Sequence, residues 1–105
     1  MTEVVQLKKV VSQSLIEEIQ ASIEHYDYEM RKAYDEEKDL RERTQILELT
    51  LTKTDSEMAK DIIRNMIEES QSELVKQVER ARICKNNRTY YQDIFEALDE
   101  AIKSL

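Results

Sequence analysis

The sequence predicts an all-α fold, a two-helix antiparallel hairpin of the coiled-coil type, and three observations lead to that prediction. The 105 residues include neither glycine nor proline, the two residue types that most tight turns use and that helix interiors exclude. Charged residues make up 37% of the chain. Apolar residues recur on a seven-residue repeat, which is the signature of long amphipathic helices and not of strands. Residues 1–105 are therefore expected to form a single hairpin domain.

The first predicted helix covers about residues 3–50. Its apolar positions alternate steps of three and four, so they form one continuous seam along the helix. The predicted seam is Ile16, Ile19, Ile23, Tyr26, Met30, Ala33, Glu37, Leu40, Thr44, Leu47 and Leu51. Only Glu37 and Thr44 interrupt it with polar side chains.

The helix break is placed near the middle of the chain, at about residues 51–54. The segment from Leu49 to Glu57 is rich in threonine, serine and aspartate, which have poor helix propensity. Thr54-x-x-Glu57 matches a capping box, which marks the start of a helix. An unbroken helix in a parallel coiled coil is the alternative, but a capping box has little reason to lie in mid-helix.

The second predicted helix covers about residues 55–104, and its charges indicate how it pairs with the first. Its seam is Ile63, Ile67, Leu74, Ala81, Cys84, Arg88, Tyr91, Phe95, Leu98, Ile102 and Leu105. Residues 76–92 carry five basic side chains and one acidic side chain. A turn at 51–54 places this stretch opposite Glu17, Glu18, Glu24, Asp27 and Glu29. Arg88, on the seam, is then expected to meet Glu17 or Glu18.

Toward the two chain ends a second apolar row widens the seam. Its members precede seam positions by one residue, and they are Val4, Val11, Leu15, Ile83, Tyr90, Ile94, Ala97 and Ala101. Two helices can cover one seam but not two, and exposed apolar rows of this size usually mark an interaction site. The hairpin is therefore expected to complete a larger helical bundle with a helical protein partner.

The chain offers no pattern typical of an enzyme, a metal site or a cofactor site. His25 has no Glu-x-x-His spacing, and Cys84 has no histidine nearby in sequence, so the two are expected to be a solvated side chain and a core side chain. The net charge of −7 argues against nucleic acid and anionic membranes as partners. One cysteine and no apolar run long enough for a signal peptide or membrane span lead us to expect a cytoplasmic location.

Near the C-terminus, Phe95 and Asp99 form an aromatic-x-x-x-acid pattern. A small helical hairpin with this element near its end resembles the partner proteins of Gram-positive type VII secretion. These include WXG100-like proteins and the small accessory chaperones of LXG-domain toxins. The chain has no tryptophan or glycine, so it lacks the Trp-x-Gly turn and resembles the accessory-chaperone branch. The resemblance implies that the chain binds the toxin's helical N-terminal domain, together with a second small helical protein, and that it could be exported with its client.

The expected function is that of a non-enzymatic helical adaptor or targeting chaperone. The residues expected to bind the partner are Val4, Val11, Leu15, Tyr90, Ile94, Phe95 and Asp99. Two alternatives stay open at this point. One is a structural coiled-coil protein that self-associates as a homodimeric four-helix bundle, and the other is a small regulator that docks on an enzyme.

Overall fold

The protein is an all-α two-helix hairpin, as the sequence predicts. The computed structural model describes the backbone of residues 2–105 and the side chains from Lys9 onward. Helix α1 covers Thr2–Lys53 and helix α2 covers Glu57–Lys103. Within these residues no strand is present. Three residues, 54–56, connect the helices.

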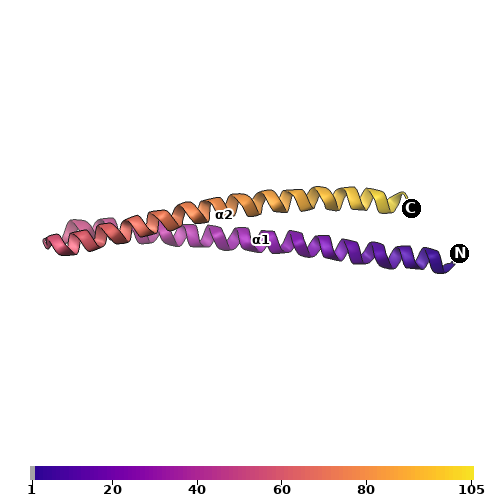
Figure 1. Ribbon diagram of the computed structural model, residues 1–105, viewed down its shortest axis with the longest axis horizontal. Coiled ribbons are helices and arrows are strands. Elements are labelled where there is room, and N and C mark those ends of the chain that lie inside the picture. The colour runs from indigo at the N-terminus through magenta and orange to yellow at the C-terminus, as the bar shows by residue number, and fades with distance from the viewer. Residues whose placement is uncertain (1) are drawn as a thin grey trace. The chain divides into compact units, whose positions relative to one another are not determined.

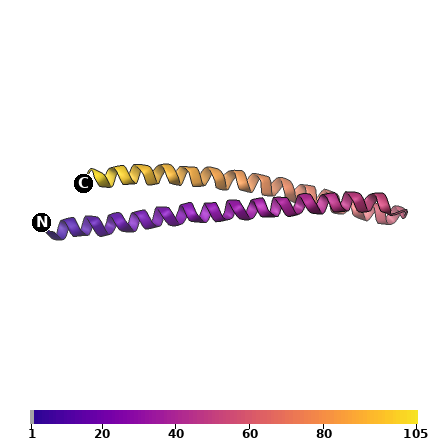
Figure 2. The same ribbon diagram turned by 180° about the vertical axis from the view of Figure 1, so that it is seen from behind.

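The chain divides into two compact units, and each unit contains one segment of α1 and one segment of α2. The open-end unit joins Met1–Glu29 to Ile83–Leu105, and the turn unit is Met30–Arg82. In both units α1 and α2 lie side by side and run antiparallel, as the two opposite views agree (Figures 1 and 2). Both chain ends belong to the open-end unit.

The turn lies later in the chain than predicted, at residues 54–56 instead of 51–54. The hydroxyls of Thr50 and Thr52 donate to the carbonyls of Ile46 and Leu49, at 2.7 and 2.6 Å. Both threonines lie within α1 despite their poor propensity, with their side chains bonded back to the preceding turn.

The cap of α2 also differs from the predicted Thr54–Glu57 capping box. The backbone N–H of Ala59 donates to Ser56 Oγ at 3.3 Å, so Ser56 is the N-cap residue. The N–H of Ser56 in turn donates to Thr54 Oγ1 at 3.3 Å. Thr54 thus shapes the turn, and Ser56 begins the helix.

Replacing Ser56 by alanine is expected to lower the free energy of unfolding by about 1 kcal/mol, because one N–H of the first turn of α2 loses its acceptor. Urea denaturation followed by circular dichroism measures this loss. The change Thr54→Ala should cost less, since its hydroxyl accepts from the turn and not from the helix. Equal losses for the two variants would contradict the assignment of the cap.

Four seam residues of the turn unit are buried. Ala33 is 0% exposed, Ala81 and Ser70 are 3% exposed, and Met30 is 8% exposed. Ser70 occupies a seam position that apolar periodicity alone does not reveal, between Ile67 and Leu74. Its Oγ accepts a hydrogen bond of 3.1 Å from Arg43 Nε, which satisfies a polar group in an otherwise closed seam.

The facing pairs correct the predicted register of the helices. Arg88 meets Asp27, at 2.7 Å between Nη1 and Oδ1, and not Glu17 or Glu18. In the turn unit Arg80 Nη1 lies 3.6 Å from Glu36 Oε2. When the turn lies later in the chain, the α1 residue that faces a given α2 residue also lies later, by twice the displacement of the turn. This explains why Arg88 meets a residue after Glu17 and Glu18 and not before them.

Candidate partner-binding surface

The two helices cover the seam of the open-end unit only in part. Among its described residues only Cys84 is buried, at 8% exposure. The large side chains of the predicted seam in this unit are half-buried. They are Ile16, Ile19, Ile23, Tyr26, Tyr91, Phe95, Leu98 and Ile102. This unit therefore has more apolar side chain on its seam than its two helices cover.

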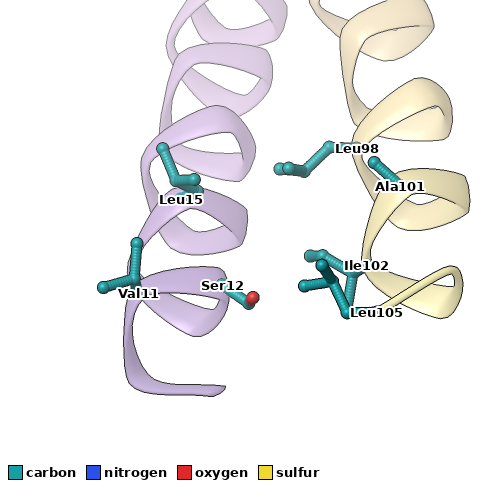
Figure 3. Close-up of a pocket in the computed structure, with 7 residues that line it drawn as sticks. All are labelled: Val11, Ser12, Leu15, Leu98, Ala101, Ile102 and Leu105. Carbon is teal, nitrogen blue, oxygen red and sulfur yellow. The ribbon is translucent and has the colours of Figure 1, made fainter. Parts of the chain in front are cut away.

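A groove of about 350 Å³ lies between the helices near the chain ends. Figure 3 shows Val11, Ser12 and Leu15 on α1, and Leu98, Ala101, Ile102 and Leu105 on α2. Leu98 and Ile102 point from α2 toward α1, and Ser12 points from α1 toward α2. Apart from the Ser12 hydroxyl, every side chain that lines this groove is apolar.

The second apolar row is exposed, and its members on both helices lie on one face of the unit. Val11, Leu15 and Ala101 line the same groove, so the rows that contain them flank it together. Residues seven apart on a helix lie almost directly above one another. Ile94 therefore shares the row of Ala101, and Ile83, Tyr90 and Ala97 form the adjacent row. We call these residues, with Val11 and Leu15, the apolar face.

Four side chains of this face that were expected to bind the partner are substantially exposed. Val11 is 53% exposed, Leu15 is 42%, Tyr90 is 60% and Ile94 is 46%. Burying such side chains against a partner would favour binding by about 25 cal/mol of free energy for each Å² of apolar area removed from water. Val4 was also expected to bind the partner, but it lies outside the residues whose side chains the structure describes.

Phe95 and Asp99 are not part of the apolar face. Phe95 lies half-buried on the seam. The carboxylate of Asp99 forms an ion pair of 2.9 Å with Lys103. At about 100° per residue, Asp99 lies about 140° around α2 from Ile94. Of the seven residues expected to bind a partner, Val11 and Leu15 line one groove, Tyr90 and Ile94 are exposed on the rows of α2 that continue from it, and Asp99 lies apart from them.

The side of the open-end unit opposite the apolar face carries a half-buried ion pair. Asp27 and Arg88, whose side chains are 28% and 26% exposed, join α1 to α2. Next to them the rings of Tyr26 and Tyr91 stack at 5.6 Å between centroids. Arg88 Nε is buried and finds no hydrogen-bond partner among the described residues. This side is therefore closed by specific contacts.

Two other titratable side chains of the described residues have particular neighbours. His25 is exposed, and its ring lies edge-on to Tyr26 at 5.1 Å. Two hydrogen bonds from Arg82 hold the pKa of Glu79 below its usual value, on a fully solvated surface of the turn unit. Within the described part of the chain, no group of three or more metal-ligating side chains occurs. No described helix has an apolar stretch long enough to cross a membrane.

Sequence reasoning missed a second exposed apolar patch, which lies on the turn unit near residues 54–56. Ile46 is 65% exposed, Leu49 is 61%, Met58 is 79% and Ile62 is 59%. Ile46 and Ile62 precede seam residues Leu47 and Ile63, so they continue the second row into a part of the chain where we did not expect it. Leu49 and Met58 fall outside both rows. The signal was available as large apolar residues at spacings of three and four on the outer surface of each helix.

The fold and these surfaces were compared with known proteins in three ways. No protein-family model, no curated protein and no solved structure matches this chain.

Proposed function

We propose that this chain is a non-enzymatic adaptor that binds helices of a protein partner through the apolar face of its open-end unit. The observation that supports it is the groove near the chain ends. There a half-covered seam, with Leu98 and Ile102, lies beside an exposed second row that includes Val11 and Leu15. A partner helix laid on that face would bury both.

The more specific proposal is that the adaptor is a targeting chaperone for type VII secretion, whose client is the helical N-terminal domain of an LXG toxin. It is supported by the resemblance of the hairpin and of the Phe95 and Asp99 pattern to that group of accessory proteins. In this role the chain stays in the cytoplasm until its client is exported. It keeps the apolar helices of the client from aggregating by covering them.

The change Ile94→Asp is expected to weaken partner binding at least about a hundredfold, because it places a desolvated carboxylate in the centre of the interface. Binding is measured by co-purification and calorimetry with the helical N-terminal domain of a toxin encoded beside this chain in its host. Ile62→Asp is the matched control, since Ile62 is similarly exposed but belongs to the turn unit. Both variants should remain helical by circular dichroism. Equal binding by the two variants would show that the open-end face is not the interface.

The same purified chain separates the adaptor from a self-sufficient bundle. A partner that binds only the folded chain, at a hundredfold excess over its Kd, stabilises it by about 2.7 kcal/mol. The adaptor should therefore melt at a higher temperature with its client than without it. A homodimeric four-helix bundle would instead be a sharp dimer whose melting temperature depends only on its own concentration.

A further inference from the structure

We infer that the apolar face of the open-end unit is built for one amphipathic helix of a partner protein whose apolar stripe is bordered by lysine and arginine. The inference rests on the proposed function and deepens it, because it states the chemistry of the helix that binds. It is carried by the distribution of charge around the groove.

Every charged side chain that borders the apolar face, among the described residues, is acidic. On α1, Glu18 lies seven residues after Val11 and therefore continues its row, and Glu29 continues the row of Leu15. On α2, Asp93 and Glu100 lie within about 60° of Tyr90 and Ala97 round the helix axis. Glu18, Asp93 and Glu100 form no ion pair with any described side chain. In the described part of the chain, the apolar face is thus bordered by carboxylates on both helices.

The basic residues of this unit whose side chains are described lie on the other side. On α2 they are Lys85, Arg88 and Lys103, and each lies about 120° or more around the helix from Ile94. Two of them are engaged within the chain, because Arg88 pairs with Asp27 and Lys103 with Asp99. On α1, Lys9 is the one basic residue of this unit whose side chain is described, and it lies about 120° from Leu15. Among the described residues, Glu18, Asp93 and Glu100 therefore keep their charge without a neighbouring lysine or arginine that pairs with it.

The charge pattern excludes a second copy of this chain as the best occupant. A symmetric dimer through this face would place the same surface on both sides of the interface. Carboxylates of one copy would then face carboxylates of the other, and like charges brought together in an interface oppose association. A helix with basic borders instead places opposite charges along both edges, while its apolar stripe fills the groove.

The test uses the intact chain and two synthetic helices of about 18 residues that carry the same leucine stripe. One has lysine at the bordering positions and the other has glutamate. Fluorescence anisotropy at low salt is expected to give a Kd at least about tenfold lower for the lysine peptide. The preference should shrink at 0.5 M salt, where screening extends over only a few ångströms. Removing the apolar anchor with Ile94→Asp should abolish binding of the lysine peptide.

Matched variants assign the preference to this face. The triple change Glu18→Gln, Asp93→Asn and Glu100→Gln should remove it. The triple change Glu17→Gln, Glu24→Gln and Glu96→Gln removes the same charge from the other side and should preserve it.

Three outcomes would overturn the inference. Equal binding of the two peptides shows that the face does not select charge, and leaves the adaptor function standing if the toxin domain still binds. Binding of neither peptide shows that the face does not take a single helix. A chain that dimerises, and that Ile94→Asp converts to a monomer, shows that a second copy occupies the face.

Discussion

Replacing Ala33 by aspartate is expected to unfold the hairpin or to lower its free energy of unfolding by about 3 kcal/mol or more. Ala33 is 0% exposed, in the seam of the turn unit. The ion pair of Glu36 with Arg80 fixes the local register, so Ala81, which is 3% exposed, lies at nearly the same level on α2. A methyl group as enclosed as that of Ala33 leaves no room for a carboxylate and no water to solvate it. Small domains are stable by only about 5–15 kcal/mol, so this loss is a large part of the total.

The change Ala21→Asp is the matched control for this prediction. Ala21 is an exposed alanine on the same helix, and its replacement costs only the difference in helix propensity, about 0.7 kcal/mol. Thermal and urea melts followed by circular dichroism at 222 nm compare the two variants. Similar losses would mean that Ala33 is not enclosed by α2, and that the helices are not packed in this register.

Reversing the charge of Arg88 is expected to destabilise the chain by about 2–3 kcal/mol and to be rescued by a second reversal at Asp27. The single change Arg88→Glu brings two carboxylates together where a contact of 2.7 Å now joins opposite charges, on side chains less than one-third exposed. The double variant Arg88→Glu with Asp27→Arg restores the attraction and should recover at least half of the loss. A double-mutant cycle isolates this coupling from the other contacts of each residue.

This cycle also distinguishes the observed register from the one that the sequence predicts. If Arg88 faced Glu18, then Glu18→Arg would rescue Arg88→Glu and Asp27→Arg would not. A coupling below about 0.5 kcal/mol between residues 27 and 88 would contradict the observed pairing.

Much of the fold follows from the spacing of apolar residues. Every predicted seam position on α1 is buried or half-buried, because steps of three and four leave one stripe that two helices can share. The turn and the register were harder to predict. Low intrinsic propensity at Thr50 and Thr52 does not end the helix, and α1 continues to Lys53. Tertiary packing overrides propensity in such cases.

The candidate surface was predictable only in part. The second apolar row follows from sequence spacing, and its exposure is visible in Val11, Tyr90 and Ile94. Helix geometry places Asp99 and Ile94 on different sides of α2. The two residues are close in sequence, and both were included among the residues expected to bind the partner. The incomplete cover of the seam depends on how the two helices pack, and no local sequence pattern encodes that.

The turn of this hairpin has a consequence for assembly. In the described chain no residue adopts a left-handed backbone conformation, and Thr54, Asp55 and Ser56 can all take up helical dihedral angles. The reversal is therefore maintained by one serine cap and by the seam, and no residue there is barred from a helix. Two molecules can in principle straighten at this point and exchange their C-terminal halves, forming the same seam contacts between chains. The balance between the monomeric hairpin and the domain-swapped dimer then depends mainly on the protein concentration and on the free energy of a single helix cap.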